Sequence, residues 1–191
     1  MKATLSFLGR RAVIVHRLGD TTDRLLRQCA LLGLRAEARW QPLSAVEGVD
    51  IVLVDADEGW DGLLPWAPSE KPVPLVALLA SEAPGRIAWA LDQGADALIA
   101  KPVTASAVYP AFVMATRRHA EARQLSERIA RLEERVRLRA LVHAAVRTFM
   151  VTDGCGEEEA YGRLRREAMQ TRLTLEQTAA SILASPRRQA G

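Results

Sequence analysis

Short apolar runs alternate with amphipathic stretches through the first hundred residues. Five segments are candidate strands: residues 12–15, 34–38, 51–54, 75–79 and 97–100. The first is an almost continuous run of β-branched residues, as expected of a strand that is buried on both faces of a sheet. Helical spacing of apolar residues follows the first run, up to Gly33, and precedes the fifth, over residues 86–93. This alternation predicts a doubly wound α/β fold with a five-stranded parallel sheet, in which functional side chains gather at the carboxyl ends of the strands.

The second half of the chain has the pattern of one long helix. Apolar residues recur at alternating intervals of three and four residues between charged flanks, namely Ala122, Leu125, Ile129, Leu132 and Val136. This heptad spacing predicts a coiled coil over residues 115–140, in which the last four of these residues form the interface of a homodimer. Arg139 falls on the next heptad position and ends the apolar pattern. The alternative is an amphipathic helix that folds back on its own sheet domain.

Two further short helices are predicted after a break at residues 153–156. The first starts with glutamates at 157–159, where the helix dipole favours acidic side chains, and places Arg163 and Arg166 outward. Its opposite face carries Ala160, Tyr161, Leu164 and Ala168. Thr174 and Gln177 have the spacing of a capping box for the last helix. We therefore predict a three-helix bundle over residues 141–186, after a sheet domain over 1–114 and before a short tail at 187–191.

The composition of the 191 residues, 49% hydrophobic and 26% charged, is that of an ordinary globular protein. The net charge of +3 is unevenly divided. Residues 1–110 carry 11 Lys and Arg against 13 Asp and Glu, whereas residues 111–191 carry 15 arginines against 10 Asp and Glu. The helical half is therefore the basic half, and its charge suits an anionic partner.

Several classes of protein are excluded by what the sequence lacks. Its longest apolar stretch, 73–80, has only the length of a strand, which is too short to span a membrane. The N-terminal residues contain too few apolar residues in a row for a secretory signal. Cys29 and Cys155 lack the spacing of a metal or redox motif, which predicts reduced thiols in a cytoplasmic protein. No phosphate-binding glycine loop, zinc-protease motif or serine-hydrolase motif is present. We expect neither an enzyme nor a bound metal or cofactor.

The candidate chemistry lies in two motifs at strand ends. Residues 50–55 read Asp, four apolar residues, Asp, and Lys101-Pro102 follows the fifth predicted strand. In these features the first half of the chain resembles the receiver domain of bacterial response regulators. The resemblance implies that Asp55 stands at the phosphoacceptor position and that Lys101 stands where a lysine contacts the phosphoryl group.

The chain departs from the receiver pattern at the positions that bind the metal ion. His16 and Arg17 occupy the places of an acidic pair, although phosphoryl transfer needs Mg²⁺ and its oxygen ligands. The hydroxyl residue expected at the end of the fourth strand is replaced by Leu79, and Ser81 comes two residues later. We predict a degenerate pocket in which Arg17 or Lys101 neutralises Asp55. The alternative is a receiver that is still phosphorylated on Asp55.

The C-terminal half resembles the ANTAR domain, an RNA-binding antiterminator module found at the end of some response regulators. The resemblance rests on residues 154–169 and 175–183 and on the order of the parts: receiver-like domain, coiled coil, three-helix tail. Together with the degenerate pocket, it is closest to the aliphatic-amidase type of antiterminator regulator. That type implies a dimer that binds paired hairpins in a leader mRNA, works without phosphorylation and is held inactive by a ligand-sensing repressor protein.

The resemblance also implies where RNA binds. The candidate RNA-binding residues are Arg147, Tyr161, Arg165, Arg166 and Arg172. The first ANTAR helix usually carries an Ala-Lys pair that faces RNA, and the matching residues here are Ala145 and Val146, so the lysine is missing. The alternative function is therefore a dimeric interaction or sensor scaffold that has lost its RNA contacts.

Overall fold

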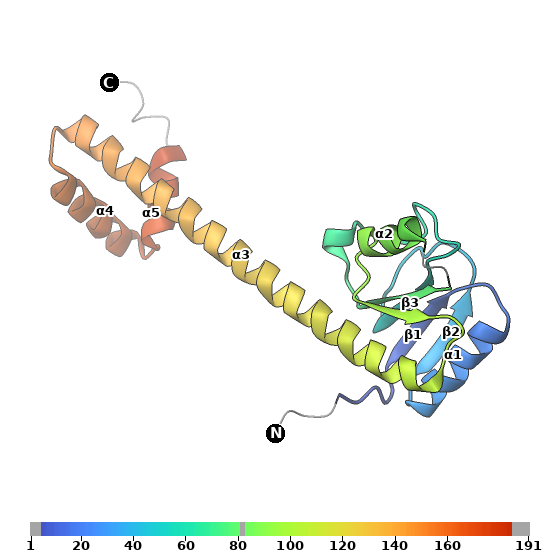
Figure 1. Ribbon diagram of the computed structural model, residues 1–191. Helices are drawn as coiled ribbons and strands as arrows, with labels where there is room; N and C mark the ends of the chain where they lie inside the picture. Colours follow the sequence, from blue (N-terminus) through green and yellow to red (C-terminus); the bar gives the residue numbers. More distant parts are fainter. Residues whose placement is uncertain (1–4, 81–82, 185–191) are drawn as a thin grey trace. The chain divides into compact units, whose positions relative to one another are not determined.

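The five apolar runs form one parallel sheet in the computed structural model, which describes residues 5–80 and 83–184 (Figure 1). The strands are β1 (Arg11–Val15), β2 (Arg35–Arg39), β3 (Ile51–Asp55), β4 (Leu75–Leu79) and β5 (Ala97–Ala100), and their order across the sheet is β2-β1-β3-β4-β5. Every neighbouring pair is parallel. The predicted α/β fold with a five-stranded sheet is confirmed. Its order brings the ends of β1, β3 and β5 to the same edge, where the candidate pocket lies.

Helices cover the two faces of this sheet unequally. Helix α1 (Asp20–Leu31) and the first turns of α3 (Ala105–Asp153) pack on one face, where Leu25, Phe112 and Ile14 share a core. Helix α2 (Pro84–Asp92) lies on the other face. The connections over residues 40–50 and 56–74 contain no α-helix, only the short 3₁₀ helix η1 (Pro68–Glu70). Leu43 and Leu63 from these connections complete the second face instead.

A second compact unit begins at residue 124, within helix α3. The last turns of α3 pack with α4 (Glu157–Thr171) and α5 (Leu175–Ala184) around a small core that includes Phe149, Leu164 and Ile182. The predicted three-helix bundle is therefore formed, and the reciprocal bonds between Thr174 and Gln177, at 3.0 and 3.2 Å, make the predicted capping box. The tail at 187–191 lies outside the described residues.

Helix α3 exposes the predicted heptad positions between the two units' cores. We call the row of Leu125, Ile129, Leu132 and Val136 the seam. About half or more of the surface of each residue is exposed: Leu125 60%, Ile129 47%, Leu132 49% and Val136 69%. Contact between such a row of large apolar side chains and water is unfavourable, so burial of these side chains against another surface would be stabilising. Within the described part of the chain, no helix is long and apolar enough to cross a membrane.

Candidate functional site

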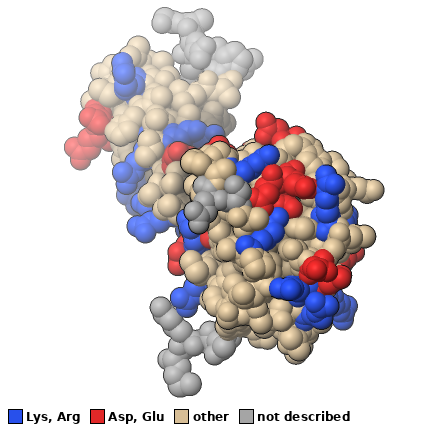
Figure 2. All heavy atoms as spheres, turned by 45° about the vertical axis from the view of Figure 1, so that its right-hand side comes forward, with Lys and Arg blue, Asp and Glu red and all other residues tan. Residues whose placement is uncertain are grey.

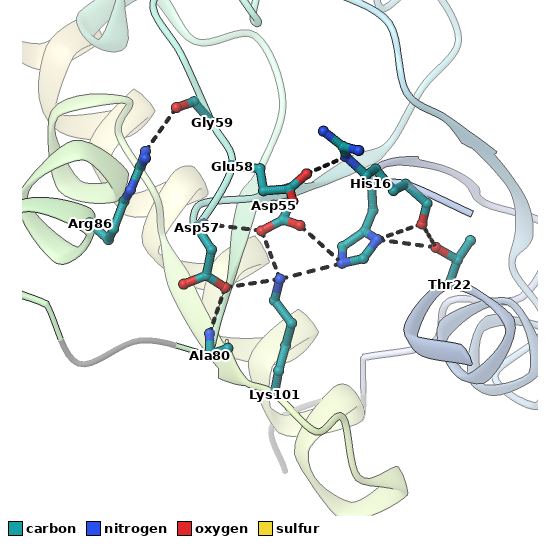
Figure 3. Close-up of polar contacts among 10 residues, drawn as sticks. His16, Thr22, Asp55, Asp57, Glu58, Gly59, Ala80, Arg86 and Lys101 are labelled. Atoms are coloured by element: carbon teal, nitrogen blue, oxygen red, sulfur yellow. Dashed lines mark hydrogen bonds and ion pairs between the residues drawn. The ribbon is translucent and has the colours of Figure 1, made fainter. Parts of the chain in front are cut away.

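A buried ion cluster lies at the carboxyl edge of the sheet (Figure 3). Asp55, the last residue of β3, is only 2% exposed. The Nζ of Lys101, just after β5, lies 2.7 Å from Asp55 Oδ1. The Nε2 of His16, just after β1, lies 3.1 Å from Asp55 Oδ2. Both carboxylate oxygens of Asp55 are therefore engaged, one by a side chain from the end of the neighbouring strand β1 and the other by a side chain from the end of β5, two strands away.

A second carboxylate, which the sequence analysis did not single out, completes the cluster. Asp57 Oδ2 lies 2.9 Å from Lys101 Nζ and accepts a hydrogen bond of 2.7 Å from the backbone N–H of Ala80. The backbone N–H of Asp57 donates to Asp55 Oδ1 at 3.0 Å. Lys101 therefore ties the ends of β3 and β5 together through two carboxylates. The Asp-x-Asp spacing after a buried strand was the available signal for this role.

The partners of His16 hold its ring in place between β1 and β3. Its Nδ1 lies 2.7 Å from the backbone carbonyl oxygen of Arg17, and the Thr22 hydroxyl donates to that same carbonyl at 2.6 Å. A carbonyl accepts only, so Nδ1 is the donor in this contact. Nε2 lies between the Asp55 carboxylate, at 3.1 Å, and the Lys101 ammonium, at 3.4 Å. The ring therefore fixes one side of Asp55 and Lys101 by contacts at both of its nitrogens.

Lys101 is the cation that two carboxylates of the cluster share. Burial by itself would lower the pKa of Lys101, but the hydrogen bonds and the Coulomb attraction of Asp55 and Asp57 outweigh it and raise the pKa above its ordinary value. Lys101 therefore stays charged at neutral pH. Because buried ions that lose a partner are strongly destabilising, each member holds the others in place.

The residues of this pocket do not fit a magnesium ion. Mg²⁺ requires several oxygen ligands in an octahedron, and here the acidic pair of receivers is replaced by His16 and Arg17. The oxygens of Asp55 face Lys101 and His16, and the charge of Lys101 repels a divalent cation. In the described ranges, no group of three or more His, Cys, Asp or Glu has the arrangement of a metal site. The pocket therefore holds the ammonium group of Lys101 beside the carboxylates, and it lacks the acidic ligands of a metal ion.

Arg17 does not neutralise Asp55. Its guanidinium forms an ion pair with Glu58 and lies over the ring of Trp40, 5.5 Å from the centroid. Of the two neutralising residues that the sequence proposed, Lys101 makes the contact and Arg17 does not. Leu79, buried at the end of β4, offers no hydroxyl group, and Ser81 lies outside the described residues. On the face of the sheet domain that Figure 2 shows, basic and acidic side chains are interspersed.

The candidate RNA-binding residues all lie on the surface of the bundle. Arg147 is exposed on α3, and the other four, Tyr161, Arg165, Arg166 and Arg172, are exposed on α4 or at its end. Tyr161 and Arg165 are four residues apart on one helical face, whereas Arg147 belongs to another helix. Tyr161, expected on the buried face, is 45% exposed at the edge of the bundle.

Arg163 differs from its predicted outward position. Its guanidinium stacks over the ring of Phe149 at 4.5 Å from the centroid and forms an ion pair with Asp153. Phe149 is fully buried in the bundle, so Arg163 closes the bundle where α3 ends. Its side chain is occupied by an internal contact and is not one of the residues facing an anionic partner.

The missing lysine position lies inside the bundle. Ala145 is fully buried and Val146 is 4% exposed, and both belong to the core that α4 and α5 cover. Neither side chain contacts solvent to a useful extent, so this position contributes packing and no charge. Arg147, one residue further on, is exposed, about 100° around the helix.

The chain matches two protein-family models. Residues 10–116 match the model described as AmiR, N-terminal, and residues 130–183 match the model described as ANTAR domain. Among curated proteins, it is similar to the transcriptional regulatory protein PdtaR of two Mycobacterium tuberculosis strains, CDC 1551 / Oshkosh and H37Rv. The identity to each is 30% over 145 residues, which cover 74% of this chain and 70% of the relative.

Solved structures of signalling proteins also resemble the chain. The response regulator StyR matches with a TM-score of 0.49 and 15% identity, over 92% of this chain and 98% of that one. The signal receiver domain of an HD domain-containing protein from Pseudomonas fluorescens Pf-5 matches with a TM-score of 0.48 and 16% identity. That match covers 59% of this chain and 98% of the receiver domain.

Proposed function

Because the chain belongs to the family of response regulators with an ANTAR domain, we propose that it is a dimeric RNA-binding transcription antiterminator that works without phosphorylation. The family is one of regulators and not of enzymes. The proposed target is a leader mRNA with paired hairpins, whose binding prevents a terminator from forming. The observation that carries the phosphorylation-independent part is that both carboxylate oxygens of Asp55 are occupied, one by Lys101 and the other by His16.

The ion cluster supports this proposal through the chemistry of phosphoryl transfer. To act as a nucleophile, Asp55 needs one oxygen free to attack and a metal ion to neutralise the charge that develops. Both oxygens are engaged: Oδ1 by Lys101 and the N–H of Asp57, and Oδ2 by His16. Freeing one oxygen breaks a buried ion pair, and the acidic ligands of a metal ion are missing. The pocket is thus suited to one permanent arrangement of Asp55 and its partners, and not to switching by phosphorylation.

The exposed arginines of the bundle support the RNA-binding part. RNA loops present phosphates and unstacked bases, which arginine and tyrosine side chains bind by charge and by stacking. Arg165 and Arg166 lie on the exposed side of α4, next in sequence to the buried Leu164 that anchors the helix. A dimer presents two such surfaces to two hairpins, so the second contact is intramolecular and strengthens binding.

A regulator that does not respond to phosphorylation needs another input. We propose that a partner protein, of the ligand-sensing repressor kind, supplies it by binding the chain and blocking the RNA-binding state. The receiver-like domain is then a docking module whose fold is stabilised by its internal ion cluster.

A titration of a two-hairpin leader RNA over a series of salt concentrations tests the RNA proposal. The double variant Arg165→Ala/Arg166→Ala is expected to bind about tenfold more weakly, with a shallower dependence of affinity on salt, because each lost phosphate contact lowers the slope by about 1. Arg24→Ala, an exposed arginine on α1, is the matched control and should bind as the parent does. Equal binding of a scrambled RNA at low salt would refute sequence-specific recognition.

Burial of Val146 favours a second candidate function. Where the family carries a lysine towards RNA, this chain has a core residue, so one phosphate contact is missing. A dimeric scaffold that binds a protein partner and no RNA would follow if several such contacts were lost. The same titration separates the two, since a scaffold shows no specific binding even at low salt.

A further inference from the structure

A groove of about 570 Å³ lies in the second unit, where the last part of α3 meets the first turns of α4 and α5. It is lined by Arg139, Val142, His143, Val146, Glu157, Glu158, Tyr161, Leu175 and Glu176. Its volume falls within the range of about 300–1,000 Å³ that is typical of sites occupied by another molecule or segment. Of the proposed RNA-binding residues only Tyr161 lines this groove, and the ion cluster contributes no residue to it.

The α3 wall of the groove continues the exposed apolar seam of the same helix. The seam runs through Ile129, Leu132 and Val136, and the next positions at intervals of three, four and three residues are 139, 143 and 146. Arg139, His143 and Val146 occupy those positions, and all three line the groove. The seam and the α3 wall of the groove therefore lie on the same face of the helix, and a helix that packs along the seam would continue into the groove.

Charge favours a cationic protein surface as the occupant. Three glutamates from the first turns of α4 and α5 line the groove, and such carboxylates repel the phosphates of RNA. The cation on the α3 wall is Arg139, and the structure gives it no ion pair with any described residue. A second α3 brings the same arginine and supplies a counter-ion for the glutamates.

We propose that a second copy of this chain occupies the groove, so that the dimer seam extends past Val136 to His143 and the two bundles are joined as well as the coiled coil. This inference rests on the proposed homodimer. In it, Arg139 of each copy lies beside glutamates of the other. A charged residue at a seam position lowers stability but fixes the register and orientation of the two helices, which explains why the apolar pattern is interrupted there.

Disulfide crosslinking of the full chain tests this extension. Single cysteines are introduced by Leu132→Cys in the proposed coiled coil and by His143→Cys at the groove, in a chain that carries Cys155→Ser. Matched controls are Arg131→Cys and Ala144→Cys, each one residue away and exposed on another face of the helix. We expect the two seam variants to form dimer crosslinks at rates within about threefold of each other, and at least about tenfold faster than their controls.

Each contrary outcome identifies what fails. If Leu132→Cys crosslinks and His143→Cys reacts no faster than Ala144→Cys, the dimer stands and the extension into the groove is wrong. If neither seam variant crosslinks while leader RNA still binds, the homodimer is wrong and RNA binding stands. If leader RNA protects the His143→Cys thiol from crosslinking, the groove belongs to RNA and the proposal is overturned.

A charge exchange gives a second readout. Arg139→Glu is expected to weaken dimerisation by about five- to tenfold in sedimentation, because two ion pairs are lost per dimer. Combining it with Glu158→Arg should restore most of that loss, whereas Glu158→Arg alone should weaken the dimer. Absence of any rescue, together with equal crosslinking at the groove and its control, would contradict the proposed pairing.

Discussion

Replacement of Lys101 by methionine removes the cation that joins Asp55 to Asp57. The variant keeps the length and most of the volume of the side chain but leaves two carboxylates without the cation that they share. The side chains of Lys101, Asp55 and Asp57 are 14%, 3% and 18% exposed, so solvent replaces little of the lost interaction. Loss of one partner from a buried ion pair costs about 3–5 kcal/mol. We expect the free energy of unfolding of the sheet domain to fall by that amount.

Urea unfolding followed by tryptophan fluorescence measures this loss directly. All four tryptophans lie in residues 40–89, so the signal reports on the sheet domain alone. At about 3 °C per kcal/mol for a chain of this length, the same variant should melt about 9–15 °C lower.

Two comparison variants make the result specific to the ion cluster. Arg24→Met, which removes an exposed arginine from α1, should change the unfolding free energy by less than about 0.5 kcal/mol. The double variant Lys101→Met/Asp55→Asn should be more stable than Lys101→Met alone, because the uncompensated charge is removed as well. A loss below about 1 kcal/mol in Lys101→Met, or strict additivity in the double variant, would refute the assignment of Lys101 as the centre of a buried cluster.

Three further outcomes follow from the same contacts. The pKa of Lys101 is raised in the folded protein, so the stabilisation by Lys101 is complete below the pKa of lysine in the unfolded chain and is lost as pH rises through the higher folded value. The free energy of unfolding of the parent should therefore fall above about pH 10.5, and that of Lys101→Met should not show this fall. Burial raises the pKa of Cys29 to about 11, so a thiol reagent at pH 8 should label only Cys155 in the native protein and both thiols in denaturant. Leu132→Glu should give monomers in sedimentation velocity with an unchanged melting transition of the sheet domain, and a persistent dimer would exclude the seam as its interface.

Strands β1, β3 and β4 could be predicted because they are almost wholly buried and their sequences are apolar runs. The edge strands β2 and β5 are only partly buried, and they were predicted from their place in the alternation of strands and helices. The loops between them were less predictable. Residues 56–74 contain Gly59, Gly62 and Pro65 among other breakers, and the chain there forms no α-helix. Leu63 from this loop takes the place of a helix in the core.

The sequence predicted which residues form the candidate pocket, but it did not predict which of them contact each other. Asp55 and Lys101 follow from their positions at strand ends, and the structure brings them together. Successive residues at a strand end point to opposite sides, so His16 turns to Asp55 while Arg17 turns outward to Glu58. The sequence alone did not distinguish the two. Arg163 was misplaced for a related reason, since its contact with Phe149 comes from another helix.

The measurement that tests the central claim most directly combines phosphorylation and RNA binding. The parent chain and Asp55→Asn are incubated with a small-molecule phosphodonor and Mg²⁺, and intact mass and affinity for the two-hairpin leader RNA are recorded on the same samples. The account predicts specific RNA binding, no phosphoryl adduct, and the same affinity with and without the phosphodonor. A phosphoryl adduct that is absent from Asp55→Asn and that changes RNA affinity, or no specific RNA binding under any condition, would contradict it.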